Sequence, residues 1–194
     1  FDNSIVVGYP KLDVYNYFFK NNHPEKKNLK KTIIYAPHHS YQIKKKKDIY
    51  TNIGTFIWSG EKILNFAKEH SEYNWIFKPH PRLKTVLYND KNFGKEFTEK
   101  YYADWASIGT SYEYGNYFEL FMNSDLLITD CDSFLIEYMP TGKPIIRLEK
   151  DKCSKISENG KKILEGIYNC KTFNMFEQTF KEVFINNNDI YKNK

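Results

Sequence analysis

The chain has 194 residues, of which 41% are hydrophobic and 18% aromatic, a composition that excludes a disordered chain and suits a globule with a sizeable core. Its formal net charge of +5 includes a run of four lysines at residues 44–47, but no nucleic-acid-binding motif accompanies it, so we expect no nucleic-acid partner. No apolar run approaches the roughly 20 residues that span a bilayer, and no signal peptide is recognisable.

Short β-rich runs alternate with longer helical patterns along the first half of the chain. We expect strands at residues 4–7, 32–36 and 74–78, each followed by a glycine or a proline, and helices at residues 12–19 and 56–70. Such alternation is typical of a parallel sheet covered by helices.

The second half continues the same alternation. Residues 81–103 look helical with an interruption near Gly94, and residues 113–122 predict a short helix. Its expected buried residues are Tyr114, Phe118, Leu120 and Phe121. A strand at 125–129, a helix at 133–139, a strand at 144–148 and a closing helix at 173–184 follow, with a frayed end from Asn186. We find no repeat or long linker, so we predict a single α/β domain with a Rossmann-like parallel sheet over residues 1–194.

In an open parallel sheet, ligands bind outside the carboxyl ends of the strands. The first such loop carries His38, His39 and Ser40. It is either an exposed polar loop or a phosphate contact. Adjacent side chains on an extended chain point to opposite sides, so we expect at most one histidine to face a ligand unless the loop turns. Carboxylates at matching positions are not evident, so we expect no metal site.

The second loop carries Lys78, His80 and Arg82, with prolines on both sides of the histidine. Proline fixes φ and restricts the residue before it, so His80 should lie in a stiff turn at a strand end. The neighbouring cations should disfavour its imidazolium form. A neutral histidine can act as a base or donate a hydrogen bond to phosphate, and a purely structural role is also open.

The third loop follows the strand at 125–129. Thr129 and Asp130 stand at the strand end, and Asp132 or Ser133 stands where a helix cap belongs. Free amides at a helix start attract phosphate oxygens. Glu137 lies four residues after Ser133 and therefore on the same helical face. The pattern suits a ligand with phosphates near the cap and hydroxyls further along the helix.

The cysteines and the first residue bear on cellular context. Cys131, Cys153 and Cys170 are odd in number and lack metal-ligand spacing, which favours a reducing compartment. Phe1 stands where a complete chain would have methionine, so we expect a piece of a longer protein. We expect a cytoplasmic location, with possible peripheral contact between the basic run and anionic lipid at the inner face of the plasma membrane.

Five short motifs occur in a fixed order along the chain. They lie at residues 8–13 (GYPKLD), 35–37 (YAP), 78–81 (KPHP), 127–130 (LITD) and 143–146 (KPII). In this order they resemble the C-terminal half of the CDP-glycerol glycerophosphotransferase family, the enzymes of teichoic acid and some capsule synthesis. The resemblance extends to about Leu148.

The resemblance implies a GT-B architecture with two Rossmann-like domains, in which the C-terminal domain holds the donor and an N-terminal domain is missing here. It implies that an acceptor hydroxyl attacks the donor's β-phosphate and CMP leaves, without a cofactor or bound metal. His80 matches the family's functionally important histidine, and Ser133 matches a serine that meets the donor phosphates. Thr129 and Asp130 match the strand end of the family's motif.

Three departures concern the donor. The family usually has threonine, an aromatic residue and arginine where His38, His39 and Ser40 stand. Asp132 replaces a common serine, and Glu137 replaces an aspartate. These changes favour a nucleotide-linked donor other than CDP-glycerol itself, for capsule or lipopolysaccharide.

Three hypotheses stay open from the sequence. The first is a CDP-alcohol type phosphotransferase that acts on a polymer or lipid-linked acceptor. The second is a nucleotide-sugar glycosyltransferase of the same architecture, in which Glu137 holds the ribose hydroxyls. The third is a non-catalytic module that docks partners or anionic membrane through its basic loops.

Overall fold

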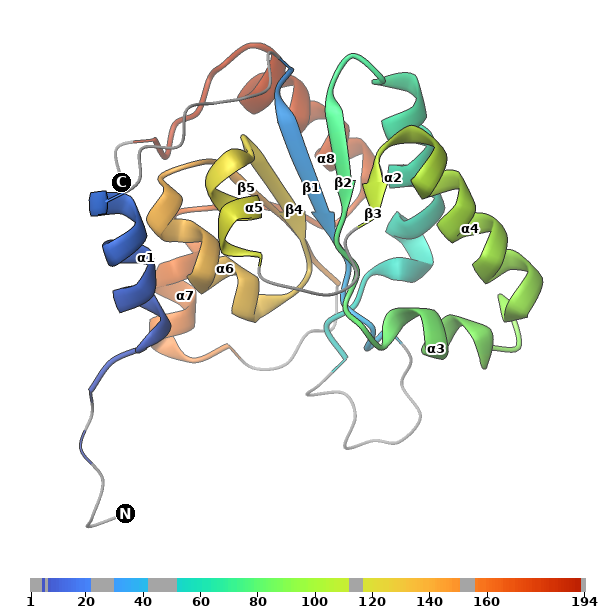
Figure 1. Cartoon of the computed structure of the whole chain (residues 1–194), viewed down its shortest axis with the longest axis horizontal. Helices are drawn as coiled ribbons and strands as arrows, with labels where there is room; N and C mark the ends of the chain where they lie inside the picture. The colour runs from blue at the N-terminus through green and yellow to red at the C-terminus, as the bar shows by residue number, and fades with distance from the viewer. Residues whose placement is uncertain are drawn as a thin grey trace.

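A parallel sheet forms the centre of the structure, a computed structural model that describes residues 5, 7–21, 30–41, 52–111, 117–150 and 156–192 (Figure 1). Its strands are β1 (Thr32–Ala36), β2 (Asn74–Phe77), β3 (Thr110–Ser111), β4 (Leu126–Thr129), β5 (Ile145–Leu148) and β6 (Tyr168–Cys170). They lie in the order β3-β2-β1-β4-β5-β6, and every neighbouring pair is parallel. The chain therefore moves outward from β1 to β3, then returns to the other side of β1. This is the order of a Rossmann fold, and the crevice between β1 and β4 is its switch point.

Helices cover both faces of the sheet (Figure 1). They are α1 (Lys11–Asn21), α2 (Phe56–Glu69), α3 (Leu83–Tyr88), α4 (Gly94–Ile108), α5 (Phe118–Asn123), α6 (Asp132–Tyr138), α7 (Glu158–Leu164) and α8 (Phe173–Phe180). A 3₁₀ turn (Met139–Thr141) follows α6, and a π-helical turn (Lys181–Ile185) follows α8.

The alternating side chains of β1 divide the core in two. Ile33 and Tyr35 pack with residues from α2, α4 and α8, whereas Ile34 and Ala36 pack with residues from α1, α5 and α6. All five residues of β1 are buried, as expected for the central strand of a sheet that is covered on both faces. Two cores of this kind hold the strand ends in fixed positions, which is what a site at those ends requires.

The predicted fold class, a Rossmann-like parallel sheet flanked by helices, is confirmed, and most predicted elements match. The strand predicted at residues 4–7 is wrong where it can be checked, because Ile5 and Val7 lie outside any strand and are 86% and 78% exposed. The break predicted near Gly94 separates α3 from α4, and Gly94 has φ +72°, a conformation that glycine adopts without strain. Phe121 is buried as predicted, but Phe118 and Leu120 are only half-buried.

Other predictions fall partly outside the described residues. The basic run at 44–47, Tyr114 and Cys153 lie outside them, while Cys131 and Cys170 are free thiols. The sequence did not predict β3, α7 or β6. In the part of the chain that the structure describes, no helix combines the length and the apolar character that crossing a membrane requires.

Candidate functional site

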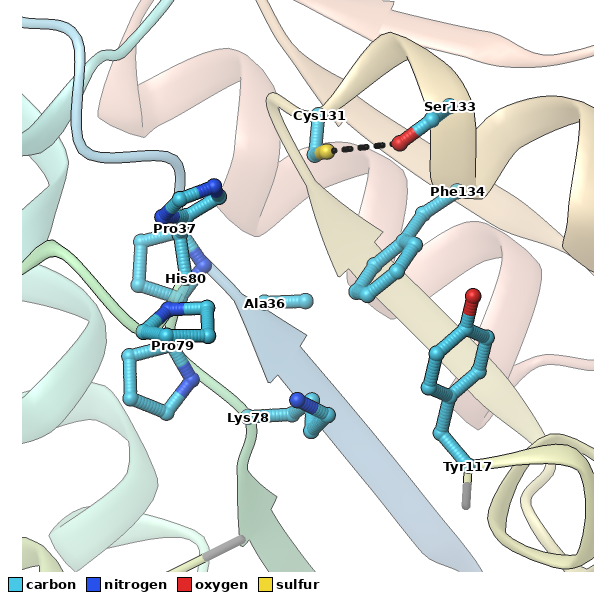
Figure 2. A pocket seen from close by; sticks show the side chains of 10 residues that line it. Ala36, Pro37, Lys78, Pro79, His80, Tyr117, Cys131, Ser133 and Phe134 are labelled. Atoms are coloured by element: carbon cyan, nitrogen blue, oxygen red, sulfur yellow. Dashed lines mark hydrogen bonds between the residues drawn. The ribbon is translucent and has the colours of Figure 1, made fainter. Parts of the chain in front are cut away.

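A cavity of about 330 Å³ lies at the carboxyl ends of β1, β2 and β4 (Figure 2). Its walls come from segments that are far apart in the sequence. They are Ala36, Pro37, Lys78, Pro79, His80, Pro81, Tyr117, Cys131, Ser133 and Phe134. The cavity thus occupies the switch point of the sheet, where the topology predicts ligand binding.

Lys78 places a cation in this apolar wall. The residue is only 5% exposed, and its Nζ lies 5.8 Å from the ring centre of Tyr117 and 6.0 Å from that of Phe134. Aromatic faces attract a cation at this range. Figure 2 shows Lys78 on the strand-end side of the cavity and the two rings across from it. A positive charge held among apolar groups is well suited to an anionic ligand.

His80 is held by its own turn and by the neighbouring strand end. Its backbone N–H donates to the carbonyl of Pro37 (2.9 Å), and the backbone N–H of Arg82 donates to its Nδ1 (3.1 Å). Because Nδ1 accepts a hydrogen bond, the proton of the neutral ring lies on Nε2. Burial lowers the pKa of His80, and the cations Arg82 and Lys78 lower it further, in the direction predicted from the sequence.

The two adjacent histidines meet His80 in one group. The ring centre of His39 lies 4.3 Å from that of His38 and 4.0 Å from that of His80, and the rings of His38 and His80 are 4.9 Å apart. Both histidines of the pair approach His80, which is the case the sequence left open if the loop turned, because β1 ends at Ala36 and the chain bends at His39. Ser40 fixes His38, with its Oγ 2.8 Å from Nδ1.

Buried polar groups fix the loops under the cavity. Asp130 accepts hydrogen bonds from the backbone N–H of His38 (2.6 Å) and from the backbone N–H (2.6 Å) and hydroxyl (2.8 Å) of Thr55. Burial raises the pKa of Asp130 to about 6, although these hydrogen bonds oppose the rise. The Thr129 hydroxyl donates to the carbonyl of Ala36 (2.7 Å) and accepts from the N–H of Cys131 (3.0 Å). Both residues therefore shape the site from beneath and do not line it.

The start of α6 differs from the prediction. Neither Asp132 nor Ser133 caps the helix; the N-cap is Cys131, without a side-chain hydrogen bond. The Asp132 carboxylate instead lies 3.6 Å from Nε of Arg147, and the Ser133 hydroxyl lies 3.2 Å from the Cys131 sulfur. The capping prediction is wrong because both side chains have other partners. Ser133 remains in the cavity wall, as Figure 2 shows.

Glu137 is buried and engaged by three side chains. Its carboxylate accepts hydrogen bonds from the hydroxyls of Tyr9 (2.6 Å) and Tyr117 and from Nζ of Lys11 (2.9 Å). Burial would raise the pKa of Glu137, but these hydrogen bonds outweigh it and the pKa is lowered. Lys11 and Tyr9 thereby fasten the amino-terminal segment to α6. Through Tyr117 the same carboxylate supports the cavity wall.

Comparison with known proteins places this chain in a family. Residues 1–177 match the family model described as CDP-Glycerol:Poly(glycerophosphate) glycerophosphotransferase. The chain belongs to this glycerophosphotransferase family. The resemblance seen in the short motifs is confirmed over nearly the whole chain.

Individual relatives are more distant. A teichoic acid poly(ribitol-phosphate) polymerase of Bacillus spizizenii is 28% identical over 161 residues, which make up 77% of this chain and 23% of that protein. A UDP-GlcNAc 2-epimerase from Neisseria meningitidis, solved with UDP-GlcNAc, shares the fold with a TM-score of 0.52 at 14% identity, covering 94% of this chain and 43% of that one. The wall teichoic acid polymerase TagF aligns over 74% of this chain and 33% of its own, at 21% identity and a TM-score of 0.36, too low to bear on the fold. The chain spans less than half the length of each of these relatives.

In this glycerophosphotransferase family member, the site residues predicted from the sequence fall into three groups. Lys78, His80 and Ser133 line the cavity. His38, His39 and Ser40 adjoin it through the histidine group, and the exposed Arg82 follows His80. The remaining predicted residues support the walls: Thr129, Asp130, Asp132 and Glu137.

Sequence reasoning missed the aromatic wall and the lysine that binds Glu137. Tyr117 and Phe134 line the cavity, and Tyr9 and Lys11 hold Glu137 from positions 128 and 126 residues away. The motif at residues 8–13 was a usable signal, since it belongs to the family pattern. No local pattern pointed to Tyr117.

Proposed function

We propose that this chain is the donor-binding part of a transferase that moves a polyol-phosphate or related unit from a nucleotide-linked donor, of the CDP-glycerol type, to a surface-polymer acceptor. One observation carries the proposal: Lys78, His80 and Ser133 converge on a single cavity at the switch point of the sheet. Family membership supports the reaction class. The similarity to a teichoic acid poly(ribitol-phosphate) polymerase supports a polyol phosphate as the transferred unit.

The chemistry follows from the charges around the cavity. A diphosphate carries negative charge that Lys78 can neutralise where apolar walls reduce screening by water. The neutral His80 carries its proton on Nε2, so in this state it donates a hydrogen bond to a phosphate oxygen and does not accept a proton there. We therefore assign His80 to stabilising the reacting phosphate as the acceptor hydroxyl attacks and the nucleoside monophosphate leaves.

The acceptor and the cellular location extend the proposal beyond the cavity. A polymer or lipid-linked acceptor needs a second surface, which we assign to a second Rossmann-like domain of the GT-B type. The isolated chain should bind donor but turn it over poorly. We place the enzyme in the cytoplasm, where the nucleotide-linked donor is found, and we assign the basic run at residues 44–47 to peripheral contact with anionic membrane.

Calorimetry on the chain with a chelator present tests the proposal. CDP-glycerol and CDP are titrated into the wild type, into His80→Ala and into Lys78→Met, which keeps the apolar stem of the lysine. Loss of one hydrogen bond to a charged group costs about 1.5–3 kcal/mol, so each variant should bind roughly 10-fold to 150-fold more weakly. His70→Ala and Lys84→Met make the same changes outside the cavity and should bind as the wild type does.

The outcomes separate the hypotheses. Equal binding by the wild type and both cavity variants would refute the donor site. A clear preference for UDP or GDP over CDP would favour the nucleotide-sugar glycosyltransferase. Absence of any nucleotide binding, together with salt-sensitive vesicle binding, would favour the docking module.

A further inference from the structure

The histidine group has a geometry that donor binding alone does not explain. One ring nitrogen each from His38, His39 and His80 can be chosen so that all three lie within 4.8 Å of one another. Two of these residues come from the end of β1 and the third from the end of β2. No other cluster of this kind occurs among the residues that the structure describes.

The backbone that carries the three rings is fixed. Pro37 precedes the histidine pair, and prolines stand on both sides of His80. The N–H of His80 donates to the carbonyl of Pro37 (2.9 Å), which ties the two loops together. The N–H of His38 donates to the buried Asp130 (2.6 Å). The approach of the three rings therefore follows from the fold and does not depend on mobile side chains alone.

One ring nitrogen of the group has no partner among the described residues of the protein. Nδ1 of His39 is buried and has no hydrogen-bond partner within the described part of the chain. Such an atom is costly to bury unless something occupies it.

We propose that His38, His39 and His80 bind one transition-metal ion of the zinc class. Imidazole ligands suit Zn²⁺, Cu²⁺ and Ni²⁺, whereas Mg²⁺ and Ca²⁺ prefer oxygen, and the group contains no carboxylate. Three histidines leave the fourth tetrahedral position of zinc open, as in catalytic zinc sites. That position would border the cavity, because His80 is part of its wall.

Binding would require a small closure of the group. With a Zn–N bond of about 2.0–2.1 Å, tetrahedral ligands stand roughly 3.3 Å apart, so the rings must approach by rotation from their present separation. His80 would give up the hydrogen bond from the backbone N–H of Arg82, which is exposed and can be replaced by water. Nδ1 of His38 accepts a hydrogen bond from the backbone N–H of Ser40 (3.2 Å) and lies 2.8 Å from the Ser40 Oγ. For Nε2 of His38 to bind the ion, the ring proton would move to Nδ1, which would then donate to the Ser40 Oγ.

The surrounding charges determine what the fourth position binds. Arg82 and Lys78 are close enough to lower the pKa of His80, so they also oppose a bare divalent cation. An anionic oxygen at the open position offsets this repulsion. A phosphate oxygen in the cavity would then meet the metal in place of the His80 N–H, so the metal-bound and metal-free states use His80 in different ways.

A zinc titration tests the site in the absence of nucleotide. ZnCl₂ is titrated by calorimetry into the tag-free chain, and Co²⁺ is titrated in parallel to follow its visible d–d bands. We expect one ion per chain and tetrahedral cobalt bands. His38→Ala, His39→Ala and His80→Ala should each weaken binding by at least about tenfold, since even outer-shell changes weaken metal affinity by roughly 10-fold to 100-fold. His70→Ala and Cys131→Ser should bind as the wild type does.

Three results would overturn the proposal. They are no one-to-one binding, full binding by the double variant His38→Ala with His39→Ala, and loss of binding in Cys131→Ser. Circular dichroism confirms that each variant is folded before titration. The nucleotide experiment is run with a chelator and the zinc experiment without nucleotide. Failure of one therefore leaves the other intact.

Discussion

The Thr129 hydroxyl joins the ends of β1 and β4 beneath the cavity, and its removal tests how the site is supported. In Thr129→Val a methyl group replaces the hydroxyl with almost no change in shape. The carbonyl of Ala36 then loses a donor at 2.7 Å, and the N–H of Cys131 loses its acceptor at 3.0 Å. Thr129 is fully buried, so water does not readily replace these partners.

The size of the effect follows from the two lost bonds. Leaving one buried polar group unsatisfied costs about 1–3 kcal/mol, so with two such groups we expect the free energy of unfolding to fall by at least about 2 kcal/mol. For a chain of this length that lowers Tm by roughly 4–8 °C. Thr129→Ser keeps the hydroxyl and loses one methyl, which costs about 0.8 kcal/mol. The serine variant should therefore be the more stable of the two.

Urea unfolding at a fixed pH measures this difference, provided that the m-value is the same in all three proteins. A valine variant at least as stable as the serine variant would refute the supporting role of the hydroxyl. If valine instead reduced only nucleotide affinity, Thr129 would contact the donor, as the sequence first suggested.

Two further predictions concern the region around the site. The pKa of Glu137 is lowered in the folded chain, so its ionised form stabilises the fold above the unfolded value of 4.5, and this contribution is lost as the pH falls through the lower folded value. Between about pH 6 and about pH 3, the free energy of urea unfolding should therefore fall more steeply with pH in the wild type than in Glu137→Gln. Parallel pH dependences of the two proteins would contradict this role of Glu137. Gly109→Ala would place Cβ 2.2 Å from the carbonyl oxygen of Trp75, so thermal unfolding should show a fold destabilised by about 1–3 kcal/mol. In Gly166→Ala the nearest neighbour of the new Cβ is 3.7 Å away, so the stability should change little. Equal stability of the two variants would refute the steric argument.

The sequence was most informative where one strong signal defined each element. The β-rich run of β1 and its stop at Pro37 predicted the strand bounds correctly, and the same holds for β4 and β5 to within one residue. By contrast, β3 has two residues and β6 has three, too few to show a period. Their places in the sheet are set by pairing with β2 and β5, which is a tertiary effect.

The sequence predicted where in the sheet the candidate site lies, but not how its side chains are arranged. The rule that ligands bind at strand ends selected loops whose Lys78, His80 and Ser133 line one cavity in the structure. It could not show that the His38 and His39 rings both meet His80, because that depends on how the chain bends after β1. The capping prediction at α6 failed for a similar reason: Arg147, from a neighbouring strand, lies near the Asp132 carboxylate.

The polar groups beneath the cavity are hydrogen-bonded within the protein. The backbone N–H groups at the strand ends are bound by Thr129 and Asp130, and the carboxylate of Glu137 is bound by Tyr9, Lys11 and Tyr117. These buried polar groups are satisfied within the protein, so they do not compete for an incoming anion. The imidazole of His80 and the ammonium of Lys78 lie above them, in a wall that is otherwise largely apolar. An anion that enters there exchanges water for the fixed ammonium of Lys78 and the N–H of the neutral His80, and fixed donors of this kind stabilise a phosphate well where water is excluded.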